Sequence, residues 1–275
     1  MAGLRIHHIN TLTMCPISAR LVNGKGGPFE RGRLVCHCLV VESDDGLILV
    51  DTGIGTDDIR DVGRLGFPFG HFAGPKCDPT EPALARIKAL GFDPRDVRHI
   101  VPTHLDVDHA GGLPDFPEAT VHIYREEHEA ALRPQSALER MRYHAVHFAH
   151  GPKWKTHEVE GDTWLGLQAI KAIDHQGDVL LVPLLGHTRG HCGVAVRTET
   201  GWLLHAGDAY FHHSEIREGR GSCPVGLAAF QRFIAANNTL RLQSLATIKA
   251  LHNDHKDLEI TSAHCPTEFD SYAAA

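Results

Sequence analysis

Short runs of Val, Ile and Leu recur along the whole chain, and Gly, Asp or Pro bounds each of them. Such bounded runs are typical of β-strands. They predict eight strands, at residues 37–43, 46–53, 98–104, 119–124, 178–184, 192–198, 201–208 and 259–264. Apolar positions with a helical period predict helices at 81–91, at 125–133 and from Gly226 to Asp254, the last with a core-facing stripe. Because strands and helices mix from end to end without a linker, we expect one α/β domain over residues 1–275.

Two segments show neither the apolar runs of the predicted strands nor the helical period. Residues 60–80 mix Gly and Pro with three Phe, and residues 142–164 contain four His and two Trp. Long irregular segments in a compact domain are usually functional or disordered. The aromatic content favours a functional role, so we expect both segments to be loop insertions that cover an active site.

The net charge and the hydropathy of the chain argue against several classes of binding partner. The 27 Lys and Arg residues against 34 Asp and Glu give a net charge of −7, and no basic block stands out. A nucleic acid or an anionic membrane surface is therefore a poor candidate partner. No apolar run approaches the ~18 residues of a membrane-spanning helix, and the amino-terminal residues do not read as a secretory signal. We expect a cytoplasmic protein.

Cysteine and histidine usage carry different information. The seven cysteines form no paired framework, which argues against a disulfide-built fold. Cys36 and Cys38 are expected to be buried thiols on a strand. The 22 histidines are an unusual number, and histidine is the commonest protein ligand of metal ions. The histidine content therefore indicates a metal site as a candidate feature of the chain.

The segment Thr103–Gly112, THLDVDHAGG, directly follows a predicted strand. Residues two apart in an extended segment project to the same side, so His104 and Asp106 can bind one metal ion. Asp108 and His109, beyond a bend, can bind another. The structural alternative is a polar loop whose aspartates cap a helix.

Four more segments place a His or an Asp where a predicted strand ends. They are LILVD ending at 51, GHTRGH at 186–191, AGD at 206–208 and SAH at 262–264. With the segment at 103–112, this ordered set resembles the metallo-β-lactamase superfamily of metal-dependent hydrolases. The resemblance extends from about Val35 to Pro266. It implies a single αββα sandwich with a dinuclear metal site.

The resemblance also implies a role for each matching residue. The first metal ion would be bound by His104, Asp106 and His187, and the second by Asp108, His109 and His264. Asp208 would bridge both ions. Asp51 and His191 would support the ligands without binding metal. Asp108 is in addition the candidate catalytic residue, which would move a proton to the leaving group. The remaining histidines, including His7, His8, His122, His128, His212 and His213, are expected to have no metal role.

One residue departs from the superfamily pattern. Asp106 stands where HxHxDH has its second histidine, so this chain reads HxDxDH. Flavodiiron proteins also have a carboxylate there, but they carry a flavodoxin-like domain that this chain is too short to include. Zinc is the expected metal, with iron or manganese as alternatives because of Asp106. Counted from the sequence, a third carboxylate lowers the formal charge of the cluster from about +1 to about zero.

These observations lead to an expected activity. The resemblance implies a hydrolase in which a metal-bridging hydroxide attacks a carbonyl. A cluster of lower charge favours a neutral lactone or ester over a phosphodiester, and superfamily lactonases and glyoxalase II thioesterases share these motifs. The alternatives are an iron-dependent, sulfur dioxygenase-like oxidoreductase, a thioesterase, β-lactamase or phosphodiesterase, and a metal-binding protein without turnover. The expected partner is a small-molecule substrate, and a homo-oligomer is compatible with the sequence.

Overall fold

The computed structural model describes residues 3–173, 178–217 and 222–273. Its first sheet has six strands, of which the first three are antiparallel neighbours and the last four run parallel. In order across the sheet they are β1 (Arg5–Met14), β2 (Leu34–Ser43), β3 (Gly46–Val50), β4 (Val97–Val101), β5 (Thr120–Tyr124) and β6 (Lys153–His157).

The second sheet has five strands. In order they are β13 (Leu258–Thr261), β12 (Trp202–His205), β11 (Cys192–Arg197), β10 (Val179–Pro183) and β9 (Ile170–Lys171). Strands β12 and β13 are parallel, whereas the other neighbours are antiparallel. A separate two-stranded sheet joins β7 (Thr163–Trp164) to β8 (Leu167–Gln168).

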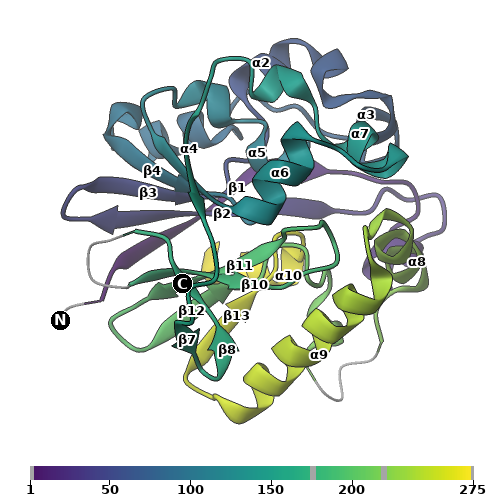
Figure 1. Ribbon diagram of the computed structural model, residues 1–275. Coiled ribbons are helices and arrows are strands. Elements are labelled where there is room, and N and C mark those ends of the chain that lie inside the picture. The colour runs from purple at the N-terminus through teal and green to yellow at the C-terminus, as the bar shows by residue number, and fades with distance from the viewer. Residues whose placement is uncertain (1–2, 174–177, 218–221, 274–275) are drawn as a thin grey trace.

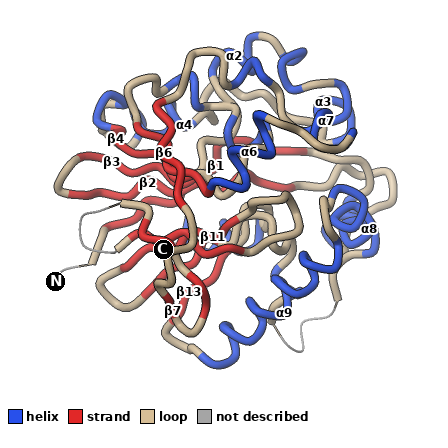
Figure 2. The backbone as a smooth tube through the Cα atoms, viewed as in Figure 1, coloured by secondary structure: helices blue, strands red, loops and turns tan. Residues whose placement is uncertain are grey.

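Helices cover the outer faces of the two sheets (Figures 1 and 2). Those of the first half are α1 (Ala19–Asn23), α2 (Thr56–Arg60), α3 (Phe67–Phe72), α4 (Ala83–Ala89), α5 (Val107–Ala110), α6 (Arg125–Leu132) and α7 (Ala137–Arg142). Those of the second half are α8 (Val225–Ile234), α9 (Asn238–Asp254) and α10 (Pro266–Ala273). The layers therefore run helix, sheet, sheet, helix, which confirms the αββα sandwich predicted from the sequence.

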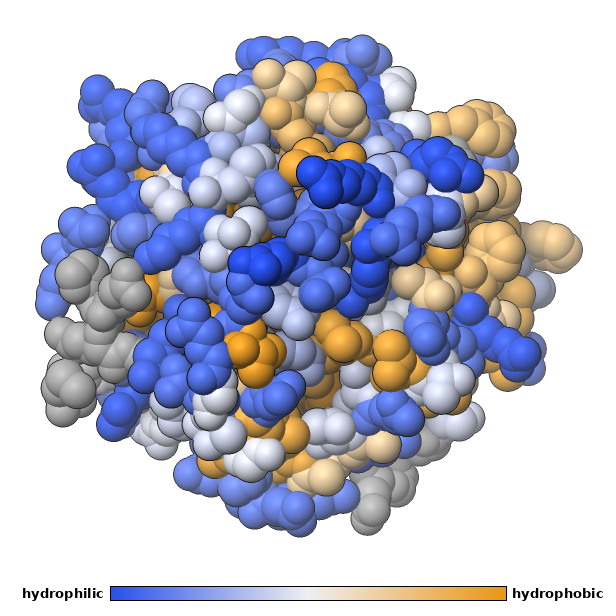
Figure 3. All heavy atoms as spheres, in the orientation of Figure 1, coloured by the Kyte–Doolittle hydropathy of each residue, from blue (hydrophilic) through white to orange (hydrophobic). Residues whose placement is uncertain are grey.

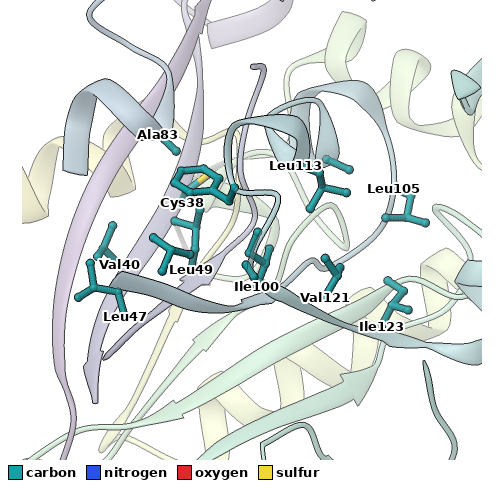
Figure 4. Packing of buried hydrophobic residues seen from close by; sticks show 14 of the residues in the cluster. Cys38, Val40, Leu47, Leu49, Ala83, Ile100, Leu105, Leu113, Val121 and Ile123 are labelled. Carbon is teal, nitrogen blue, oxygen red and sulfur yellow. The ribbon is translucent and has the colours of Figure 1, made fainter. Parts of the chain in front are cut away.

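Successive side chains along a strand point alternately toward the outer helices and toward the other sheet. On β2, Cys38 and Val40 face the outer helices and pack in one cluster with Ala83 and Ile87 of α4 (Figure 4). Leu39, the residue between them, belongs to the cluster shared by the two sheets. Both faces of the sheet are thus buried, which explains why β2 is a nearly continuous apolar run rather than a strict alternation. The prediction that Cys36 and Cys38 are buried strand residues is confirmed.

All eight predicted strands and the helices at 81–91 and 125–133 are found in the structure, with small differences at their ends. The long stretch from Gly226 was wrong as a single helix, since α8 ends at Ile234 and α9 begins at Asn238. Asn237 caps α9 by accepting from the amides of Thr239 and Leu240. The stripe is also incomplete, because Phe230 is 45% exposed.

The two predicted loop insertions contain regular structure. The first, at 60–80, includes the 3₁₀ helix η1 (Val62–Leu65) and α3. The second, at 142–164, includes β6, which pairs in parallel with β5 at the edge of the first sheet. Residues 153–157 are therefore part of the scaffold and not of an insertion. Sequence analysis missed β6 because an edge strand needs no apolar run: three of its five residues are exposed.

The surface shows where apolar side chains remain accessible. In Figure 3 they gather toward the right, over α3 and α8 as labelled in Figure 1. Phe67 and Phe72 of α3 and Phe233 of α8 are each more than 65% exposed. Among the described residues, no helix has the length and apolar character needed to cross a bilayer.

Candidate metal centre

The candidate ligands gather at one end of the two sheets. His104, Asp106, Asp108 and His109 follow β4, and His187 follows β10. Asp208 and His264 follow the parallel neighbours β12 and β13. Because all these strands end at the same edge of the sandwich, segments more than 150 residues apart meet there, with His109 Nε2 3.3 Å from His264 Nε2. The seven residues predicted as ligands are all brought together.

Asp208 lies between two pairs of histidines. Its Oδ2 is 3.3 Å from His187 Nε2 and 3.9 Å from His104 Nε2. Its Oδ1 is 3.0 Å from His264 Nε2 and 3.3 Å from His109 Nε2. Oδ2 is also 3.2 Å from His264 Nε2, so the carboxylate lies between the two pairs. The ligand atoms of Asp208 and either pair lie within 4.8 Å of one another. In this position Asp208 could hold a metal ion together with either histidine pair.

The two aspartates of the first motif lie on opposite sides of the centre. Asp106 Oδ2 is 3.3 Å from His104 Nε2 and 3.2 Å from His187 Nε2. We call the part of the centre around His104 and His187 its first side, and the part around His109 and His264 its second side. Asp108 Oδ2 is 3.6 Å from His264 Nε2, on the second side. Asp106 occupies the N-cap position of α5, but its side chain makes no capping hydrogen bond. The capping alternative is therefore wrong for Asp106.

The donor set fits two divalent cations. His104 Nε2, Asp106 Oδ1 and Asp208 Oδ1 are buried at the centre and have no hydrogen-bond partner of suitable geometry among the described residues. Burial and the neighbouring His109 lower the pKa of His104 to about 4, so its imidazole is neutral, as a ligand must be. Four imidazoles with carboxylates form a set that suits zinc.

The charges of the second side point to the same conclusion. Burial alone would lower the pKa of His109, but Asp208, Asp51 and Asp108 together hold that pKa well above its usual range. Burial likewise would raise the pKa of Asp208, but the three histidines His264, His109 and His187 hold it well below. The carboxylates therefore draw positive charge to this position, and a divalent ion satisfies the same demand when it displaces the protons.

Asp51 orients His109. Its Oδ2 accepts from His109 Nδ1 at 2.8 Å, and its Oδ1 accepts from the amide of Thr103 at 2.7 Å. The bond to Nδ1 fixes the tautomer, so Nε2 is left to face Asp208 and His264. Asp51 has a φ of +56°, a conformation that costs a non-glycine residue energy and that tends to occur at functional sites.

Replacing Asp51 with Ala should weaken metal binding without removing a ligand. We expect an affinity loss of roughly 10- to 100-fold, the usual effect of losing a carboxylate that orients a ligating histidine. Competition with a chelating dye measures it. Unchanged affinity in Asp51→Ala would mean that the Asp51–His109 bond does not orient the ligand.

His191 lies behind the centre. Its Nδ1 donates to the carbonyl of Leu184 at 2.8 Å, and its Nε2 accepts from the amide of Asp208 at 2.9 Å. Both ring nitrogens are occupied, so His191 supports Asp208 and is not itself a ligand in this arrangement. Gly207 allows the close approach, because a Cβ at this position would lie 2.6 Å from His191 Nε2.

Glu127, a fully buried residue of α6, joins the two loops of the first side. Its Oε1 accepts from the amide of Leu105 and from the hydroxyl of Tyr143, at 3.0 and 2.9 Å. Its Oε2 accepts from the hydroxyl of Thr188 and the amide of Gly190, at 2.7 and 3.0 Å. One carboxylate thus fixes the backbone next to His104 and the loop that carries His187. Sequence analysis missed Glu127, which looks like one of several acidic residues on an amphipathic helix.

Two other residues at the centre were not expected there. Cys36 Sγ lies 3.9 Å from Asp108 Oδ2, and burial raises the pKa of the thiol well above its usual range. The aromatic ring of Phe211 lies 4.7 Å from the ring of His264 and 6.1 Å from that of His187, measured between centroids. Cys36 therefore faces the second side as a neutral thiol, and Phe211 gives the centre one apolar wall.

Comparison with known proteins places this geometry in a family. Residues 31–254 match the model of the metallo-beta-lactamase superfamily. The chain is also 41% identical to the "Probable metallo-hydrolase Rv2300c" of Mycobacterium tuberculosis, over 96% of this chain and 81% of that protein. The chain belongs to the metallo-β-lactamase superfamily.

Two further comparisons concern lactonases of the superfamily. The N-acyl homoserine lactonase AiiA of Bacillus thuringiensis subsp. kurstaki is 26% identical, over 84% of each chain. A solved structure of an N-acyl homoserine lactone hydrolase, with the product N-hexanoyl-L-homoserine bound at its catalytic metal centre, has a TM-score of 0.72 and 24% identity. The match covers 98% of this chain and 97% of that one. This structural likeness confirms the superfamily fold.

Within the superfamily fold, the other histidines take different roles. Among the described residues, every group of His, Cys, Asp and Glu that could hold a metal ion lies at this one centre. His122 instead contacts two other histidines, His99 at 3.0 Å and His157 at 3.1 Å. Burial, followed by these two neighbours, lowers the pKa of His122 to about 3. Within the described ranges, His122 thus belongs to a histidine cluster away from the metal centre.

Proposed function

We propose that this metallo-hydrolase binds two divalent metal ions and hydrolyses a neutral lactone or ester. The observation that carries the proposal is the position of Asp208, whose carboxylate lies between two histidine pairs and within reach of both. His104 and His187 with Asp208 would hold the first ion, and His109 and His264 with Asp208 the second. Zinc is the proposed metal because imidazole predominates among the donors. When bound, two such ions polarise a carbonyl and lower the pKa of water.

The chain's own residues supply the remaining steps. Asp108 lies at the second side, and burial raises the pKa of its carboxyl group. A carboxyl group with a raised pKa can carry a proton, so Asp108 is the proposed proton carrier to the leaving oxygen. Asp51 and His191 keep His109 and Asp208 in place during this transfer. Their contribution is pre-organisation rather than contact with the substrate.

The surroundings of the centre favour a substrate with an apolar arm. Phe211 contacts both histidine pairs, and its ring lies 6.1 Å from that of Phe230 on α8. Phe211 is buried, Phe230 is 45% exposed and Phe233 is 76% exposed, so apolar rings occur both at the centre and at the surface of α8. An acyl chain could pack against these rings, which agrees with the lactonase names of the relatives. An iron-dependent oxidoreductase has less support, since Asp106, the residue that suggested iron, is engaged by Arg142.

A substrate panel tests the proposal. Protein of measured metal content is assayed on acyl lactones, aryl esters, thioesters, β-lactams and phosphodiesters. We expect turnover of lactones or esters to exceed that of phosphodiesters by roughly tenfold or more, since an apolar ring beside the centre disfavours an anion. Lactone substrates of increasing acyl length should show falling KM. Stoichiometric iron with oxygen consumption, or turnover of phosphodiesters alone, would contradict the proposal.

A further inference from the structure

Arg142, the last residue of α7, reaches into the first side of the metal centre. Its side chain is only 6% exposed. Nη1 donates to Asp106 Oδ2 at 2.5 Å and lies 3.0 Å from His187 Nε2, while Nη2 donates to the carbonyl of Ile234. Nothing in the sequence pattern indicated this contact, because 36 residues separate Arg142 from Asp106.

Both terminal nitrogens of the guanidinium, Nη1 and Nη2, are held by hydrogen bonds. The carbonyl of Ile234 belongs to the last turn of α8, where helix carbonyls lack partners within the helix and carry partial negative charge. Asp106 holds the other end of the guanidinium. Arg142 is therefore held at the centre by its contacts with Asp106 and Ile234, whereas its contact with His187 Nε2 would be broken when that nitrogen binds a metal ion. A guanidinium is always charged in a protein, so its positive charge is a permanent part of the centre.

This charge changes the electrostatic balance of the first side. Asp106 adds a third carboxylate to those of Asp108 and Asp208, which alone lowers the formal charge of a two-metal cluster to about zero. Arg142 restores it to about +1. We propose that Arg142 is the fixed counter-charge of Asp106 and that the pair sets the metal affinity of the first position. The inference rests on the proposed metal centre and identifies Arg142 as a positioning residue.

Metal titration of a double-mutant cycle tests the inference. The variants are Arg142→Met, Asp106→Asn and the double variant, with Arg140→Met as a control on the exposed side of the same helix. Removing the guanidinium alone leaves Asp106 uncompensated, so affinity for zinc at the first position should rise roughly tenfold or more. Removing the carboxylate alone should lower it by a similar factor. The double variant should return to within about threefold of the wild type.

Thermal unfolding supplies a second readout that does not need activity. In metal-free protein, Arg142→Met should lower Tm, because Asp106 is left as a buried charge without its partner. Added zinc should then raise Tm more in Arg142→Met than in the wild type. Arg142→Lys keeps the charge and should change zinc affinity much less than Arg142→Met does. Arg140→Met should match the wild type.

These measurements distinguish failure of the proposed dinuclear centre from failure of the counter-charge role of Arg142. Wild-type protein that binds fewer than two ions would overturn the dinuclear centre, whereas the metal-free Tm of the four proteins would still measure the ion pair. Two bound ions with unchanged or weaker first-position affinity in Arg142→Met would overturn the counter-charge role alone. Additive effects of the two substitutions would do the same.

Discussion

Asp208→Ala should lose both bound metal and hydrolytic activity together. Asp208 belongs both to the group with His104 and His187 and to the group with His109 and His264, so the substitution removes one donor from each proposed metal position. The remaining histidines would then lie beside a cavity without their main negative partner. We expect metal content to fall from two ions to less than one per chain and turnover to fall by roughly 10³-fold or more. Elemental analysis and assay of the same preparation measure both.

A matched control separates this effect from general damage. Asp162 is an exposed aspartate paired with Lys171 on the far edge of the second sheet, and Asp162→Ala should keep full metal content and turnover. Asp208→Asn retains the shape of the side chain and should still lose most activity, because an amide cannot donate two anionic oxygens. Normal occupancy and turnover in Asp208→Ala would refute the bridging role.

The strand-end residues could be predicted from the sequence for a physical reason. A buried parallel strand is a short apolar run that is easily recognised, and the residue that follows it lies at a fixed edge of the sheet. Asp208 and His264 each follow such a run, and His187 follows the buried apolar strand β10, whose neighbours are antiparallel. Their meeting required only that the three strands end at one edge. The family resemblance implied a supporting role for Asp51 close to the site, and the structure shows its bond to His109.

Arg142 and Glu127 could not be predicted in this way. Both lie on helices that cover the first sheet, and both reach the centre through the end of a long side chain. Which loop such a side chain meets depends on how the helix packs and not on any local period. The charge count from the sequence was incomplete for this reason: it included Asp106 and omitted Arg142, whose position depends on α7 and α8.

The break between α8 and α9 shows how such packing serves the centre. The amide of Ala236 donates to the carbonyl of His187 at 2.9 Å, and the amide of Asn237 donates to that of Gly186 at the same distance. A continuous helix would use these amides internally. The break frees them to hold the His187 loop, and the carbonyl of Ile234 just before it binds Arg142. Hydrogen bonds within one helical turn are thus replaced by hydrogen bonds that hold the loop of the candidate ligand His187.

Glu127→Ala should be among the most destabilising substitutions in the protein. It would leave four buried or partly buried donors without an acceptor: two backbone amides and two hydroxyls. Each unsatisfied buried group costs about 1–3 kcal/mol, and the hydroxyls can reorient, so we expect a loss of about 3–5 kcal/mol in the free energy of unfolding. Glu127→Gln keeps one acceptor oxygen and should lose about half as much. Urea denaturation of metal-free protein measures both.

The substitution should also weaken the metal centre, because Glu127 ties the backbone after His104 to the loop after His187. Added zinc should therefore restore less stability to Glu127→Ala than to the wild type, since the ligands must first be ordered. Glu129→Ala, at an exposed position of the same helix, should stay within about 0.5 kcal/mol of the wild type. A Glu127→Ala protein as stable as Glu129→Ala would show that other groups or water take over the four donors, and Glu127 would then not be the link between the two ligand loops.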